Sequence, residues 1–188
     1  MKLVSTSLGL VVAIVYSGLT VLEWDSCDDE RLTQMVTKVV SGDNKGKIHR
    51  VTKTPFKMHP STTALCRIPT PVELAASNAE VHADRYCHVY VNEPALKPMR
   101  TGQGTYPEGS LIIKQKYSDV VGTKTELFTV MRKMPKGYDA ENGDWEYSVI
   151  NSTAAKILSR GRTDSCIQCH TEYEHTDYVT RSYMLSDR

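Results

Sequence analysis

The chain opens with an apolar, uncharged run from Leu3 to Leu22. The run is about as long as the roughly 20 residues that a helix needs to cross a bilayer. Lys2 precedes it, and acidic residues follow at once from Glu23 onward. This pattern predicts a membrane anchor over residues 1–24, with the rest of the chain on the periplasmic side of the inner membrane. A secretory signal cleaved near Gly18 is the alternative, and it also exports the chain.

A helical pattern follows. A cap at Asp25 or Ser26 and a stop at Gly42 bound a helix. Its apolar residues recur three and four positions apart, as on one helix face: Leu32, Met35, Val36, Val39 and Val40. Prolines interrupt residues 43–71, which predicts an extended loop. A short helix is expected over residues 71–79, because Pro71 suits a first helical position.

The spacing of similar side chains then changes to every second residue. Side chains alternate in character between Arg85 and Val91, which is typical of a strand. Further strands are expected over Ser110–Lys116, Leu127–Arg132 and Trp145–Ile150. Short turn-prone stretches separate them, which favours an antiparallel sheet over βαβ units. A short helix from Ala154 to Ser159 is expected after the last strand, behind a capping hydroxyl residue.

These elements predict an α+β fold, mainly an antiparallel β-sheet with a few flanking helices. Residues 1–24 form the anchor or signal, 25–82 a helix and a proline-rich lead-in, and 83–188 the strand-rich domain. The composition agrees, because 188 residues with 40% apolar and 24% charged residues suit one folded domain. A net charge of +1 gives no field that would gather nucleic acid, so no such partner is expected.

One motif carries specific chemistry: Cys166-Ile167-Gln168-Cys169-His170. Two thiols separated by two residues on one helical turn can reach the two vinyl groups of a porphyrin, and the adjacent imidazole can reach the iron. The motif therefore predicts one covalently attached haem c, with His170 as the iron ligand. Half of a zinc site and a redox dithiol are the alternatives. No second CxxC or HxxxH completes four zinc ligands, and no thioredoxin-like βα pattern surrounds the motif.

The remaining cysteines suit an oxidising compartment. A disulfide between Cys66 and Cys87 is expected, which would tie the proline-rich loop to the first strand. Cys27 is left over. Acylation of Cys27 is not favoured, because the preceding residues lack a leucine-led lipoprotein pattern.

The order of several segments resembles the cytochrome P460 family, which includes the cytochromes c′-beta. The resemblance covers roughly Ala83 to Met184. It rests on the strand Cys87–Asn92, the strand opening Glu108–Lys114, the stretch Asn142–Tyr147, and the haem motif followed by Asp177-Tyr178-Val179.

The resemblance implies a mainly antiparallel fold, often dimeric, and a haem bound by the motif histidine with an open or sterically guarded distal side. Members that oxidise hydroxylamine carry a lysine linked to the porphyrin. Members of the c′-beta type bind gases such as NO behind distal phenylalanines. Lys97 and Arg100 lie nearest the expected position of the linking lysine. Tyr106 stands where a distal phenylalanine is expected, so Tyr106 is predicted to belong to the cofactor-binding site.

The sixth iron ligand decides between functions, because axial ligands help to set the potential and the access of substrate. His88 is expected to serve as hydrogen-bonded structure, and His175 follows the motif too closely to cross to the other haem face. Several methionines offer thioethers, although methionine commonly fills gaps in cores: Met99, Met131, Met134 and Met184.

Two classes of function stay open. In the first, a five-coordinate haem binds small ligands such as NO or CO, or does redox chemistry. In the second, the chain is an electron-transfer or accessory subunit of a larger respiratory or photosynthetic membrane complex. The expected partners are accordingly an electron donor or acceptor protein, a membrane complex, a small gaseous or nitrogenous ligand, or a second copy of the chain.

Overall fold

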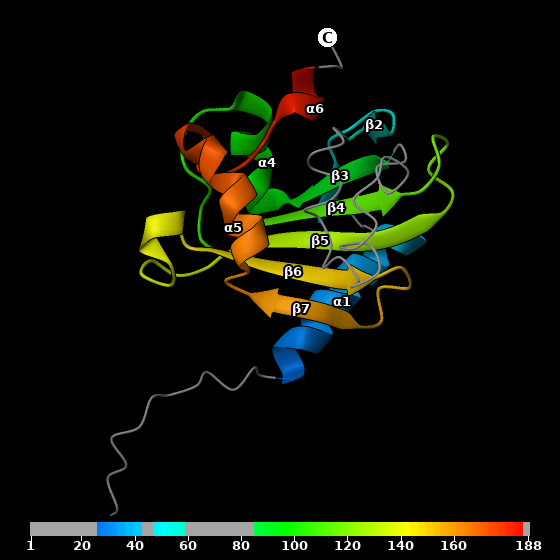
Figure 1. Cartoon of the computed structure of the whole chain (residues 1–188), viewed down its shortest axis with the longest axis horizontal. Helices are drawn as coiled ribbons and strands as arrows, with labels where there is room; N and C mark the ends of the chain where they lie inside the picture. Colours follow the sequence, from blue (N-terminus) through cyan, green and yellow to red (C-terminus); the bar gives the residue numbers. More distant parts are fainter. Residues whose placement is uncertain (1–25, 43–46, 59–84, 186–188) are drawn as a thin grey trace, which may run out of the picture.

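The structure is a computed structural model that describes residues 26–42, 47–58 and 85–185 (Figure 1). The helices and 3-10 turns in chain order are α1 Ser26–Ser41, α4 Glu93–Thr101, η2 Ala140–Asn142, α5 Asp164–His170, η3 Thr171–Thr176 and α6 Ser182–Leu185. The strands are β1 Ile48–Arg50, β2 Phe56–Lys57, β3 Tyr86–Asn92, β4 Leu111–Tyr117, β5 Thr125–Lys133, β6 Trp145–Asn151 and β7 Ile157–Gly161.

Within this described part, antiparallel pairing joins seven strands into one sheet in the order β1-β3-β4-β5-β6-β7, with β2 also paired to β3 (Figure 1). In the central ladder Ile113 pairs with Tyr90 on one side and with Val130 on the other. The prediction of a mainly antiparallel sheet with a few helices is therefore confirmed. β1 and β2 come from the proline-rich lead-in, so two short strands lie where the sequence predicted only loop.

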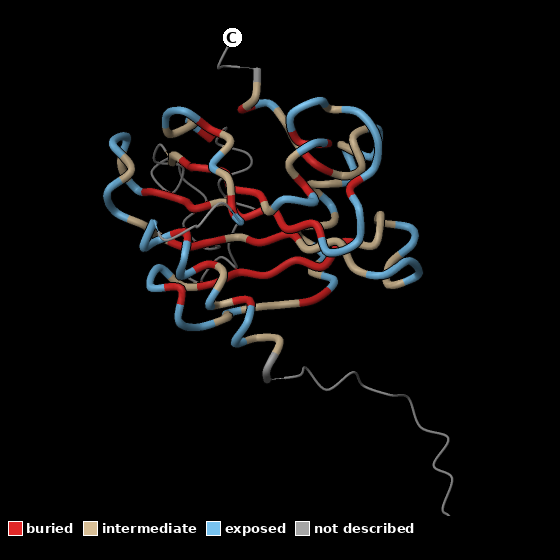
Figure 2. Tube along the Cα trace, turned by 180° about the vertical axis from the view of Figure 1, so that it is seen from behind, coloured by how far each residue is buried: buried red, intermediate tan, exposed pale blue. Residues whose placement is uncertain are grey.

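Alternation along the strands gives the sheet two apolar faces. On β4, Leu111 and Ile113 contribute to one core cluster, whereas Ile112 contributes to the other. Figure 1 shows α1 crossing one face of the sheet, with α5 on the opposite side. In Figure 2 the buried residues follow the central strands. Each large apolar side chain that is fully buried contributes about 1.5–3 kcal/mol, and α1 buries three of its apolar residues in this way: Leu32, Val36 and Val39.

Ion pairs fix the start of α1 against the sheet. Arg132 on β5 donates to both carboxylate oxygens of Asp28 at 2.8 Å, and it pairs with Glu146 on β6 at 2.9 Å. Arg160 on β7 pairs with Asp28 and Asp29. The hydrogen-bonded Arg132 holds the pKa of Asp28 well below its usual range, so this carboxylate is charged at neutral pH. α1 therefore covers one face of the sheet, and the candidate functional site lies on the opposite face.

The segment after β6 differs from the prediction. The expected helix over Ala154–Ser159 is wrong, because β7 begins at Ile157 and pairs antiparallel with β6. Asn151 Oδ1 accepts the backbone N–H groups of Ala155 and Lys156, both at 3.0 Å, and so closes a turn. Ala154 within this turn has a φ of 59°, which is incompatible with a right-handed helix.

The helix α4 is an element that the sequence analysis does not predict. Pro94 stands in its first turn, where proline is favoured, but Pro98 falls inside it, where proline usually ends a helix. Its start is set by Asn92, whose Oδ1 accepts the N–H of Ala95 at 3.4 Å and that of Leu111 at 2.9 Å. The helix therefore forms where an asparagine cap also ties it to β4.

The predicted anchor over residues 1–24 and the predicted helix over residues 71–79 lie outside the described residues. Among the residues that are described, no helix combines the length and apolar character needed to span a membrane.

Candidate haem-binding site

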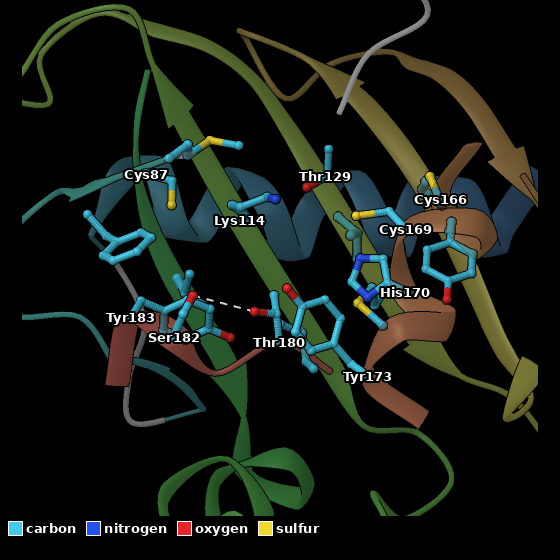
Figure 3. A pocket seen from close by; sticks show the side chains of 18 of the residues that line it. Cys87, Lys114, Thr129, Cys166, Cys169, His170, Tyr173, Thr180, Ser182 and Tyr183 are labelled. Atoms are coloured by element: carbon cyan, nitrogen blue, oxygen red, sulfur yellow. Dashed lines mark hydrogen bonds between the residues drawn. The ribbon is translucent and has the colours of Figure 1, made fainter. Parts of the chain in front are cut away.

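A cavity of about 580 Å³ opens on the sheet face opposite α1. Its volume falls within the range of small-molecule and cofactor sites. The floor comes from the central strands, and α5 with the segment after it forms a wall (Figure 3). Apolar side chains dominate the floor: Phe56, Met58, Val89, Ile112, Met131 and Tyr147.

The motif lies on α5, which forms part of this wall. Cys166, Cys169 and His170 all line the cavity, and Figure 3 shows both thiols and the imidazole on the side that faces the sheet. Residues three and four apart lie on one side of a helix, so the spacing of the motif brings the three groups together. The structure therefore places the predicted thioether and iron-binding groups on one wall of one cavity.

The tautomer of His170 follows from its hydrogen bond. Its Nδ1 lies 2.6 Å from the backbone carbonyl oxygen of Tyr178. A carbonyl only accepts, so Nδ1 carries the proton and the lone pair is on Nε2. The pKa of His170 is lowered to about 4, mainly by burial and to a smaller extent by the positive charge of Lys114, although the hydrogen bond to Tyr178 acts in the opposite direction. The imidazole is therefore neutral at physiological pH, which is the form that binds a metal.

The cavity has the character that a haem requires. A mainly apolar floor lies opposite the two thiols and the imidazole of α5, so a porphyrin in the cavity would contact apolar side chains on one side and these three groups on the other. The hydroxyl of Tyr147 gives a second indication. It is buried without a hydrogen-bond partner among the described residues, although Tyr147 lines the cavity and its ring packs 5.4 Å from that of His170. A bound group or an ordered water in the cavity would satisfy this hydroxyl.

The zinc alternative gains no support from the described part of the chain. It holds no group of three or more His, Cys, Asp or Glu side chains that could bind a metal ion. The residues present therefore fit haem better than a four-ligand zinc cage.

Lys114, which the sequence analysis does not single out, lies in the cavity. It projects from the middle of β4 beside its cross-strand neighbour Thr129 (Figure 3). Lys97, the residue nearest the expected linking lysine, is exposed on α4 and does not line the cavity. The period-two pattern of β4 could have identified Lys114, because its side chain shares a face with Ile112.

Tyr106 lies outside the cavity lining. Its side chain is 3% exposed and packs edge-on against Trp145, with 5.5 Å between ring centroids. Its hydroxyl lies 3.8 Å from the sulfur of Met99 on α4. The loop after α4 thus directs this side chain into the core between α4 and β6. The structure therefore gives no support to the prediction that Tyr106 belongs to the cofactor-binding site.

The candidates for a sixth ligand separate clearly. His88 points away from the cavity face and its Nδ1 lies 2.8 Å from the hydroxyl of Thr52, in agreement with the expected structural role. His175 is exposed. Met131 lines the cavity, and so does Met58, which the sequence analysis does not consider. The other three methionines that the sequence analysis considered do not line the cavity: Met99, Met134 and Met184.

Cys87 is buried on β3 and lines the cavity on the side opposite α5 (Figure 3). Its predicted disulfide partner, Cys66, lies outside the described residues, so the disulfide stays a prediction. Cys27 belongs to α1, and its side chain is likewise outside what the structure describes.

Comparison with known proteins agrees with this site. The family model described as Cytochrome P460 matches residues 70–181, which is more than half of the chain and includes the motif. A search of curated proteins finds no match. The chain therefore belongs to the cytochrome P460 family, and this membership implies a haem cytochrome.

Proposed function

We propose that this chain is an exported, membrane-tethered monohaem c-type cytochrome of the P460 or c′-beta type, which binds small ligands such as NO at a five-coordinate iron. The observation that carries the proposal is the geometry of His170. Its Nδ1 is bound to the Tyr178 carbonyl, and its ring lines the cavity together with both motif thiols. This leaves Nε2 as the one imidazole nitrogen available in the described part of the cavity.

The residues of α5 would hold the haem. Cys166 and Cys169 would form thioethers with the two vinyl groups, and Nε2 of His170 would bind the iron from the proximal side. The bound haem would supply an iron centre able to take up a diatomic ligand or exchange one electron. The chain itself would orient the proximal imidazole through Tyr178 and exclude water with the apolar floor of the sheet.

The opposite side of the cavity supports an open sixth position. Among the described residues, no histidine other than His170 lines it. Its distal groups would be mainly apolar side chains of the sheet, the thioethers of Met58 and Met131 among them, together with Lys114. An ammonium group near the iron could stabilise a bound anionic or polar nitrogenous ligand. This arrangement favours ligand binding over a closed, six-coordinate centre.

We expect the reduced holoprotein to have a high-spin ferrous spectrum that changes on addition of CO or NO. The physical reason is that, among the described residues, no second imidazole lines the cavity to compete for the sixth position. The measurement is the absorption spectrum of the dithionite-reduced protein with and without each gas. A low-spin ferrous spectrum that does not respond to CO would contradict the open site.

The alternative is an electron-transfer or accessory cytochrome of a membrane complex, and Met58 and Met131 are the observations that favour it. Either thioether could close the sixth position, since both side chains line the cavity. The substitutions Met58→Leu and Met131→Leu distinguish the two functions. CO binding that appears only after one of them would establish a thioether-ligated electron-transfer centre. We also propose an electron donor or acceptor protein, and a second copy of the chain, as its partners.

We propose that the domain lies on the periplasmic side of the membrane, tethered by residues 1–24. The uncharged run Leu3–Leu22 and the acidic residues after it support this location. Attachment of haem c, which generally takes place outside the cytoplasm, supports it too. Cell fractionation should recover the haem-containing chain with membranes. Recovery of a soluble holoprotein that begins near Gly18 would instead indicate a cleaved signal.

A further inference from the structure

The carbonyl that holds His170 belongs to an unusual backbone corner. Asp177 has a φ of 55° and Tyr178 a φ of 64°, so two consecutive residues other than glycine adopt the left-handed conformation. This conformation is unfavourable for residues with a Cβ atom, and asparagine and aspartate tolerate it best. The corner is therefore maintained by its surroundings rather than by its own backbone preference.

The Asp177 carboxylate is the main attachment of this corner. Lys133 Nζ on β5 donates to its two oxygens at 2.6 and 2.7 Å, and the Tyr106 backbone N–H donates to it at 2.7 Å. Only 8% of the Asp177 side chain and 12% of the Lys133 side chain are exposed. A charge-assisted pair with so little solvent access is held in one geometry.

Two further segments fix the same corner. The Trp145 indole N–H on β6 donates to the Asp177 carbonyl oxygen at 2.9 Å, and the Tyr178 hydroxyl donates to the Glu141 carbonyl oxygen at 3.0 Å. The Tyr178 ring also lies directly over Gly143, where an added Cβ would come within 2.4 Å of it. Strands β5 and β6 and the turn at η2 thus all contribute to the position of one carbonyl group.

We propose that Asp177, through its ion pair with Lys133, is a positioning residue for the proximal histidine and thereby sets the electron donation of His170 to the iron. The inference rests on the proposed function, because it requires that His170 binds haem iron. The Tyr178 carbonyl accepts the Nδ1 proton, and a firmly held acceptor makes the imidazole a more basic ligand. A more basic ligand stabilises ferric over ferrous iron, which lowers the reduction potential.

Two substitutions with opposite charge changes test this role. Asp177→Asn removes a negative charge yet keeps a side chain that tolerates positive φ and can still accept the Tyr106 N–H. Lys133→Met removes a positive charge, and with it the ammonium group over the Trp145 ring, but leaves in place the hydrogen bonds that Trp145 and Tyr106 donate to Asp177. If Asp177 and Lys133 acted only through their charges, the first substitution would raise the potential and the second would lower it. A positioning role requires both to raise it, because each loosens the corner.

The measurements are the ferric/ferrous midpoint potential and the iron–imidazole stretching frequency of the ferrous holoprotein by resonance Raman spectroscopy. We expect both variants to raise the potential, by up to the 59 mV that corresponds to a tenfold change for one electron, and to lower the stretching frequency. Lys136→Met is the matched control, because Lys136 is exposed three residues beyond Lys133 and its substitution should leave the frequency unchanged.

The outcomes separate this inference from the proposed function. No iron–imidazole band in the wild-type protein would overturn the proposed function and the inference with it. A wild-type band that keeps its frequency in both variants, or potentials that move in opposite directions, would overturn the positioning role alone. If Asp177→Asn fails to fold, the milder Lys133→Met decides the question by the same two measurements.

Discussion

Replacing Cys166 and Cys169 together by alanine should abolish covalent attachment of haem. Both thiols lie on α5 and line the same cavity, so each can reach one vinyl group of a single porphyrin. Mass spectrometry of the denatured wild-type protein should show the chain plus one haem, whereas the double variant should have the mass of the chain alone. The expected effect is complete, because no thioether can form without a thiol.

Cys87→Ala is the matched control for this substitution. Cys87 also lines the cavity, but it projects from β3 on the side away from α5. The variant should therefore keep its covalent haem.

A Cys166→Ala, Cys169→Ala double variant that still carries haem after denaturation would contradict the prediction and indicate a second covalent link. Lys114 would then be the residue to test, and its replacement by methionine in the double variant should release the haem. That result would favour the cross-linked, hydroxylamine-oxidising type within the family.

The strands were predictable because their signal is local. β6 alternates apolar and polar side chains from Trp145 to Val149, and β4 opens on three consecutive apolar residues next to a turn-prone stretch. Each strand has seven residues, which exceeds the mean length of a strand. The haem motif was predictable for the same reason, since its three groups fall within one turn of helix. α1 was predictable from its apolar stripe, which the structure packs against the sheet.

Elements set by side-chain hydrogen bonds were harder to predict. Asn151 captures two backbone N–H groups and turns the chain into β7, although the alanines after it have high helix propensity. Asn92 does the opposite by capping α4, a helix whose internal Pro98 argues against it. In both places one asparagine outweighs the propensity of the segment that follows, and the sequence does not show which backbone groups its side chain will reach.

The remainder of the site depends on contacts between distant segments. Lys114 reaches the cavity only because the register of the sheet places it beside Thr129, and Met58 reaches it because the lead-in pairs with β3. Tyr106 was assigned by its place in the sequence order, whereas packing against Trp145 turns it into the core. The motif identified the candidate iron ligand, but sequence order could not identify which side chains face the other side of the cavity.

Replacing His170 by glycine should leave the thioethers intact but remove the proximal iron ligand. Nδ1 of His170 is bound to the Tyr178 carbonyl and the imidazole is neutral, so Nε2 is the group suited to the iron. Loss of this ligand should change the absorption spectrum in both oxidation states. It should also raise the reduction potential by a sizeable part of the range of about 0.8 V that axial ligands control. Denatured protein should still carry one haem by mass, since Cys166 and Cys169 are unchanged.

Added imidazole provides the decisive control for this variant. Glycine leaves a space beside Tyr147, whose ring packs 5.4 Å from that of His170 in the wild-type protein. Free imidazole should enter this space and restore much of the wild-type spectrum, because the cavity and both thioethers persist. The restored iron–imidazole band should nevertheless differ from the wild-type band, since a free imidazole is not tied to α5 and need not donate to Tyr178.

His175→Gly, at an exposed position in η3, should leave the spectrum and the potential unchanged. An unchanged spectrum in His170→Gly would show that another side chain binds the iron, and among the described residues Met58, Met131 and Lys114 line the cavity from which such a ligand would come.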